Sequence, residues 1–124
     1  MFRVFVIAIF LCLAFSVYLG LDPLRKSEQN LQAYVLSITP IGTQYDEAQD
    51  IIRAKDWQIT RLSDKSGFLH QGSKPWVEVG SMYVRASLGD YRGFPFEVNV
   101  TVYWGFSESG ELIDIWVWKT SNGL

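Results

Sequence analysis

The chain has 124 residues, of which 11 are Lys or Arg and 13 are Asp or Glu, so its formal net charge is −2. This balance excludes a strongly basic nucleic-acid binder, and 48% hydrophobic with 15% aromatic residues is enough to form the core of one domain. A single Cys and a single His exclude an internal disulfide framework and a Cys-based or multi-His metal site, so we expect no metal and no cofactor.

Residues 1–21 differ in composition from the rest of the chain. Arg3 carries the only charged side chain among them, and the run 4–21 is uncharged. A run of this length lies at the lower limit for a helix that spans a bilayer. The segment fits a secretory signal peptide, with residues 4–13 as the apolar region and Ala14-Phe15-Ser16 as the cleavage site. It also fits an uncleaved membrane anchor.

Both interpretations export the remaining chain. We therefore expect residues 1–21 to be a signal peptide or an N-terminal membrane anchor, and residues 22–124 to form one domain. This domain would lie on the periplasmic or extracellular side, with membrane contact only through residues 4–21 if the leader is retained. Cys12 follows bulky apolar residues, which argues against a lipoprotein signal and for a small apolar role.

Two amphipathic helices are predicted after the leader. Asp22-Pro23 is typical of a helix start, and Pro40 disfavours helix at the residue before it. The second helix is predicted over about residues 44–55, with Thr43 as its cap and Asp46 as the acid of a capping box. The apolar faces of the two helices comprise Leu24, Leu31, Tyr34, Val35, Tyr45, Ala48, Ile51 and Ile52.

Beyond the second helix the hydrophobic period changes from 3.6 to 2, which indicates strands. Short connections between the strands favour an antiparallel sheet, and the helices must cover its apolar face. The predicted fold class is therefore α+β, with two N-terminal helices packed on one face of a four-stranded antiparallel sheet. The strands are predicted near 57–62, 82–88, 96–104 and 112–119, with a loop at 64–75, a turn at 89–93 and a hairpin loop at 107–110.

The last predicted strand places large aromatic residues on one face. If Ile113, Ile115 and Val117 face the helices, the two tryptophans between and after them face outward. The neighbouring strands add tyrosines and an arginine to that face, an unusual composition for a wet surface and one that resembles interface hot spots. The predicted partner-binding residues are Tyr83, Arg85, Tyr103, Trp116 and Trp118.

Two other arrangements of this region remain open. In the first, the register of the last strand is reversed, so that Leu112, Trp116 and Trp118 point toward the helices. In the second, the loop 64–75 folds over the aromatic face and covers it. Only a truly exposed patch marks an interface, so both arrangements weaken the prediction of a binding surface.

The sequence contains no strong signal for a set of catalytic residues. His70 lies in a polar loop with no nucleophile motif and no orienting carboxylate nearby. Glu97, Glu108, Glu111 and Asp114 cluster in sequence near one hairpin, where solubility explains the loop charges. We therefore predict no catalytic residue and no enzymatic activity. A small hydrolase that uses His70 remains an alternative function.

A second alternative is a carrier of an apolar small ligand. Its ligand would lie between the helices and the sheet, or beneath the loop 64–75. A cavity lined by Trp57, Trp76 and Trp104 would support this alternative, and a tightly packed interior would argue against it.

The order of parts also resembles a known group of proteins. The motifs that carry this resemblance are TPIGT at 39–43, LGDY at 88–91 and WGFSESGEL at 104–112. Over about residues 24–124 the chain resembles the fold shared by small outer-membrane-assembly lipoproteins of the SmpA/OmlA type and the repeats of β-lactamase-inhibitor proteins. The resemblance implies a non-enzymatic protein that binds other proteins at the cell envelope. The chain departs from the group because it lacks a lipobox.

Together these observations predict an exported, non-enzymatic envelope protein. Its partner would be another envelope or secreted protein, bound through the aromatic face of the sheet. An inhibitor or immunity-type role and an assembly-accessory role remain equally open.

Overall fold

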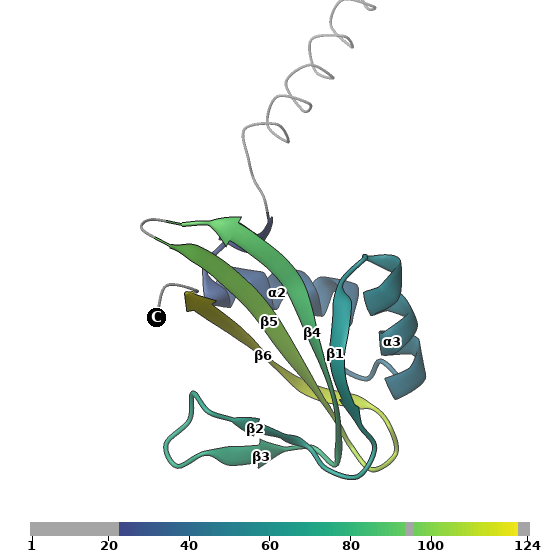
Figure 1. The fold of residues 1–124 in the computed structure, drawn as a ribbon. Coiled ribbons are helices and arrows are strands. Elements are labelled where there is room, and N and C mark those ends of the chain that lie inside the picture. Colours follow the sequence, from purple (N-terminus) through teal and green to yellow (C-terminus); the bar gives the residue numbers. More distant parts are fainter. Residues whose placement is uncertain (1–22, 94–95, 122–124) are drawn as a thin grey trace, which may run out of the picture.

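The computed structural model describes residues 23–93 and 96–121 (Figure 1). The predicted leader and Cys12 lie outside the described residues. In chain order the elements are the 3-10 helix η1 (Pro23–Arg25), the helices α2 (Glu28–Ile38) and α3 (Tyr45–Ala54), and the strands β1 (Gln58–Ser63), β2 (Phe68–His70), β3 (Val77–Val79), β4 (Met82–Arg92), β5 (Glu97–Phe106) and β6 (Leu112–Ser121).

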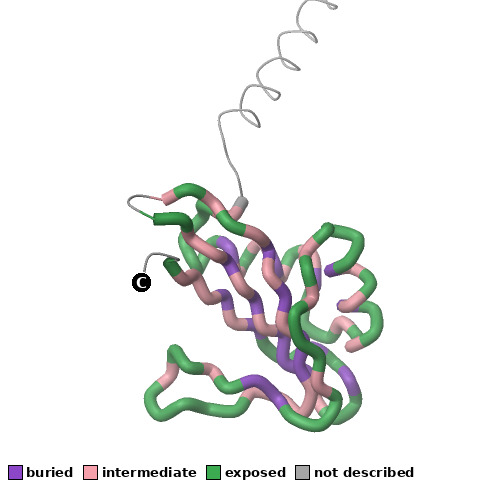
Figure 2. The backbone as a smooth tube through the Cα atoms, viewed as in Figure 1, coloured by how far each residue is buried: buried purple, intermediate pink, exposed green. Residues whose placement is uncertain are grey.

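The main sheet has four antiparallel strands in the order β1-β4-β5-β6. Helix α2 crosses behind the sheet in Figure 1, and α3 lies beside β1 at its edge. This arrangement confirms the predicted α+β class. Figure 2 shows the buried residues along the central strands and on the sides of the helices that face them. The core consists of Leu31, Val35, Ala48, Ile52, Val84, Ala86, Leu88, Val100, Val102, Trp104, Phe106, Leu112, Ile115 and Val117.

Helix α2 begins later than the sequence predicts. A 3-10 turn follows Asp22, and the α-helix starts only after Ser27, whose Oγ accepts a hydrogen bond from the Asn30 backbone N–H at 3.1 Å. A serine in this position satisfies a backbone donor that would otherwise be unpaired in the first turn. The hydroxyl of Ser27 therefore sets the start of the helix.

The predicted cap of α3 is wrong. Gln44 occupies the cap position and makes no side-chain capping bond, while the Thr43 hydroxyl donates to the Pro40 carbonyl oxygen at 2.6 Å. The Thr43 side chain thus closes the turn before the helix instead of capping the helix. Gln44 instead forms an antiparallel bridge with Glu111, which ties the start of α3 to the last hairpin.

The turn predicted at residues 89–93 is also wrong, because β4 runs through most of it. The pairing of β4 with β5 shifts register between Ser87 and Gly89, and then continues to the pair Arg92 and Glu97. Gly89 has a φ of +124°, a backbone conformation that glycine adopts at low cost and that suits a bulge. The glycine therefore bends a long strand and does not end it.

The prediction that Ile113 faces the helices is wrong, because β6 contains a bulge at this residue. Phe106 pairs with Leu112 and Gly105 pairs with Asp114, so the residue between them has no partner across the ladder. Leu112 is buried, whereas Ile113 is 46% exposed. The extra residue restores the alternation, so that Ile115 and Val117 face the helices as predicted. Leu112 and Ile113 thus have the orientation of the reversed register, whereas from Ile115 onward that register is excluded.

The loop predicted at residues 64–75 contains a strand that the sequence analysis missed. Residues of β2 pair antiparallel with those of β3, giving a small two-stranded sheet that Figure 1 shows below the main sheet. Three-residue strands carry too little alternation to be seen in sequence. This hairpin packs against the face of the main sheet that points away from the helices.

The Tyr45 hydroxyl should make the free energy of unfolding depend on pH in the alkaline range. Burial, followed by the charges of Asp64 and Asp46, raises the pKa of its hydroxyl above the ordinary value of 10.0. The unfolded chain therefore ionises this group first, so its stabilising contribution is complete below about pH 10 and is lost as pH rises through the folded pKa. We expect Tyr45→Phe to reduce the fall in unfolding free energy above about pH 10, measured by urea titration. An identical alkaline profile in the variant would contradict this assignment.

Candidate functional site

The five predicted partner-binding residues share the face of the main sheet that points away from the helices, called here the open face. Arg85 pairs with Tyr103 across β4 and β5, and Tyr103 pairs with Trp116 across β5 and β6. Tyr83 and Trp118 lie two residues away along their strands. Because side chains two apart on a strand share a face, all five residues lie on one surface.

The aromatic rings of this surface are stacked on one another. The centroids of Tyr103 and Trp116 are 5.1 Å apart with an interplanar angle of 24°, and those of Trp116 and Trp118 are 5.2 Å apart at 15°. Tyr83 extends the series, 6.5 Å from Tyr103. Offset stacking of this kind stabilises each ring in its place. The open face therefore carries a preformed aromatic ladder that crosses three strands.

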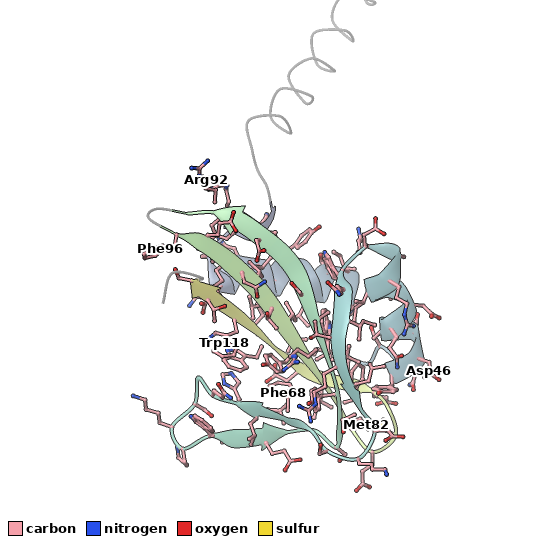
Figure 3. All side chains as sticks on the ribbon, viewed as in Figure 1. Asp46, Phe68, Met82, Arg92, Phe96 and Trp118 are labelled. Atoms are coloured by element: carbon pink, nitrogen blue, oxygen red, sulfur yellow. The ribbon has the colours of Figure 1, made fainter. Side chains whose placement is uncertain are left out.

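The β2–β3 hairpin packs on two rings of this ladder, Tyr103 and Trp116. Phe68 is buried and lies 5.4 Å from the Tyr103 ring, and His70 stacks on Trp116 at 4.7 Å and 21°. Figure 3 shows Phe68 between the hairpin and the sheet, with Trp118 at the edge of this covered region. The segment 64–75 thus folds over part of the aromatic face. Tyr83 is buried, while Trp116 and Trp118 are partly exposed.

Gly105 permits this close approach of the hairpin. A Cβ atom added there would lie 2.8 Å from Val79 Cγ1 and 2.9 Å from Phe68 Cε1, shorter than a normal carbon contact of about 3.5 Å. We expect Gly105→Ala to push the hairpin outward, lower the unfolding free energy by about 1–3 kcal/mol and speed amide exchange in β2 and β3. Thr101→Ala, on the same face of β5, is the control. Unchanged exchange in the glycine variant would show that the hairpin does not depend on this contact.

Two adjoining grooves follow the open face beside the ladder. The larger, about 450 Å³, lies between the hairpin and the sheet, and the smaller, about 360 Å³, continues along the sheet toward Trp118. Arg85 and Tyr103 line both grooves, so the two form one surface feature. The polar lining of the smaller groove comes from Thr60, Arg85, Ser87, Asn99, Thr101 and Thr120.

A second arginine belongs to this site, and the sequence analysis did not assign it. Arg61 on β1 pairs with Arg85 on β4 and lines the larger groove. A bulge between Ile59 and Arg61 turns both Thr60 and Arg61 toward the open face, where Thr60 Oγ1 accepts a hydrogen bond from Arg85 Nε at 2.9 Å. The polar residues of β1 were visible in the sequence, but their register against β4 was not. Phe68 was missed because it lies in the segment predicted as loop.

The imidazole of His70 lies between the turn of the hairpin and the Trp116 ring. Its Nδ1 accepts a hydrogen bond from the Gly72 backbone N–H at 3.1 Å, and its ring stacks on Trp116. Within residues 23–93 and 96–121, no carboxylate or hydroxyl side chain is hydrogen-bonded to the imidazole. The ring therefore serves as part of the aromatic ladder in this structure.

The three tryptophans considered for a ligand cavity do not come together. Trp104 is fully buried on the helix side of the sheet, with Trp57 6.3 Å away, whereas Trp76 is 60% exposed beside the hairpin on the other side. Trp104 Nε1 donates to Thr39 Oγ1 at 3.0 Å, so the interior at this point is a packed, hydrogen-bonded core.

In the described part of the chain, no three His, Cys, Asp or Glu side chains gather into a group that could hold a metal ion. No helix between residues 23 and 121, as far as they are described, is long and apolar enough to cross a membrane. Comparison of the chain with family models, with curated proteins and with solved structures finds no match. The resemblance to the SmpA/OmlA group therefore stays a prediction.

Proposed function

We propose that this protein is an exported, non-enzymatic envelope protein that binds another envelope or secreted protein through its open face. The observation that carries the proposal is the ordered aromatic ladder on the sheet face that the helices leave uncovered. A monomeric domain gains solubility from polar side chains on such a face, so a ladder of partly exposed rings indicates another role.

The chemistry of the open face suits a protein partner. Trp116 and Trp118 offer large apolar area with few rotatable bonds, which lowers the entropy lost on binding. Their stacking contacts hold the rings in place before a partner arrives. Arg85 and the surrounding hydroxyl and amide groups would supply hydrogen bonds that orient the partner. Inhibitory, immunity-type and assembly roles are all compatible with this mode of binding.

Site-specific photo-crosslinking in intact cells tests the proposal. A photoreactive amino acid replaces Thr101, which lies on the open face of β5, or Glu47, which is exposed on α3. We expect light to produce a discrete adduct with a second protein from position 101 and none from position 47. Adducts only from position 47, or equal smears from both, would contradict the use of the open face.

A further inference from the structure

Arg61 and Arg85 form an unusual pair on the open face. They stand directly opposite each other on β1 and β4, and both line the larger groove. Like charges in this position destabilise a sheet, because the two side chains lie within about 5 Å at their Cβ atoms. The chain as a whole has a net charge of −2, so the pair is not part of a generally basic protein.

The described residues do not neutralise this pair. Among them the single ion pair joins Arg53 to Asp50, on the solvent side of α3. Glu78 also lines the groove, but its Oε1 accepts a hydrogen bond from the Gly67 backbone N–H at 3.0 Å and does not pair with either arginine. Two guanidinium groups thus face one groove without a carboxylate partner from the described chain.

The orientation of Arg85 is already set. Its Nε donates to Thr60 Oγ1, whose hydroxyl is in turn placed to donate to the Arg85 carbonyl oxygen at 3.3 Å. This arrangement engages one side of the guanidinium and leaves its terminal amino groups for a second acceptor. A guanidinium held in this way favours a planar, two-oxygen acceptor such as a carboxylate.

The walls of the groove strengthen an ionic contact there. Phe68, Tyr83 and Tyr103 line it together with the arginines, and the first two are buried. Arg61 is exposed and Arg85 is half-buried, so these rings shield only one side of the arginine pair from water, where an ionic contact is stronger than at a fully open surface. The adjoining smaller groove extends the surface past Trp118, which is the shape that an extended peptide segment requires.

We infer that the partner presents an Asp or Glu side chain to Arg61 and Arg85, from a peptide segment that continues along the groove toward Trp118. This inference rests on the proposed function and adds the chemistry of the partner. The carboxylate bridges the two guanidinium groups and removes their mutual repulsion. The aromatic ladder then contacts the apolar residues that follow the acid.

A selection from a displayed library of random linear peptides tests the inference. The bait is the full chain in detergent. We expect the recovered peptides to share an Asp or Glu beside an apolar residue. Changing that acid to its amide should lower affinity about tenfold or more on the wild-type chain, and far less on Arg61→Gln or Arg85→Gln. The peptide change leaves the protein untouched, so misfolding of a variant does not obscure the result.

The other outcomes separate this inference from the proposed function. One outcome is that the peptides bind Trp118→Ala more weakly, but bind equally well when either arginine or the peptide acid is changed. This outcome overturns the inference and leaves the proposed binding face in place. Peptides indifferent to Trp118 and to the arginines, or no recovered peptide at all, overturn both. If inorganic phosphate competes with the peptides and their affinity does not depend on the acid, the arginines form a simple anion site and the inference is overturned. If the chain associates with itself and Arg61→Gln abolishes that association, the acid belongs to a second copy of the chain. This outcome overturns the inference of a separate partner.

Discussion

Replacing Trp104 with Ala is expected to lower the unfolding free energy by about 3–5 kcal/mol, the range for removal of a buried aromatic side chain. Trp104 is fully buried between the sheet and the helices, and its Nε1 donates to Thr39 Oγ1. Thr39 itself is buried and donates its hydroxyl hydrogen to the Val35 carbonyl oxygen at 3.0 Å. Loss of the indole therefore leaves a cavity and removes a hydrogen bond that fixes the end of α2 on the sheet. Urea unfolding followed by circular dichroism measures the change.

Two control variants separate the parts of this effect. Trp104→Phe keeps most of the apolar volume but removes the donor to Thr39, so we expect it to destabilise less than Trp104→Ala. Trp76→Ala removes an indole that is 60% exposed and should stay within about 0.5 kcal/mol of wild type. Equal unfolding free energies for Trp104→Ala and Trp76→Ala would refute the packing described for the core.

Replacing Trp118 with Ala is expected to weaken binding of the protein partner by about thirtyfold or more, equivalent to at least about 2 kcal/mol. Trp118 is partly exposed, stacks on Trp116 and lines the groove that leads away from Arg85. The hairpin residues Phe68 and His70 contact the rings of Tyr103 and Trp116, whereas Trp118 keeps an exposed part that a partner can reach. Titration of the cross-linked protein, once identified and purified, against wild type and variant gives the ratio of affinities.

Leu62→Ala is the matched control for this measurement. Leu62 is 44% exposed and pairs with Val84, whose side chain faces the helices, so it offers apolar surface on the opposite side of the sheet. We expect this variant to bind as the wild type does. A similar loss of affinity in both variants would mean that general surface apolarity, and not the aromatic ladder, governs binding.

Much of the fold was predictable because its signals are local and periodic. The apolar residues of both helices and the alternation in β5 each follow from a single segment, and they defined two layers correctly. The errors fall where tertiary contacts override local preference. Gly89 is a turn residue by type, yet neighbouring strands keep β4 paired past it. Ile113 fits a simple alternation, yet a bulge moves it outward. A glycine inside a strand pattern can mark a bulge as well as a turn, whereas no residue type marks the bulge at Ile113.

The candidate site was predictable only in part, for a related reason. Alternation along one strand placed Trp116 and Trp118 on the same face, but it left open whether that face points outward or toward the helices. The pairing of Arg61 with Arg85 depends on register between two strands joined by a long connection, which alternation does not specify. The contact between Phe68 and Tyr103 depends on a hairpin of two three-residue strands. The sequence analysis left a cover by the segment 64–75 open as one arrangement, but the residues that make it are seen only in the structure.

The most direct test of the account compares oxidation of the tryptophans by hydroxyl radicals in the free protein and in complex with the cross-linked partner. In the free protein, Trp76 should react fastest, Trp116 and Trp118 more slowly, and Trp104 least, as their exposure requires. The account predicts that the partner protects Trp116 and Trp118 and leaves Trp76 reactive. Unchanged oxidation of Trp116 and Trp118 in the complex, with protection on α2 or α3 instead, would contradict it.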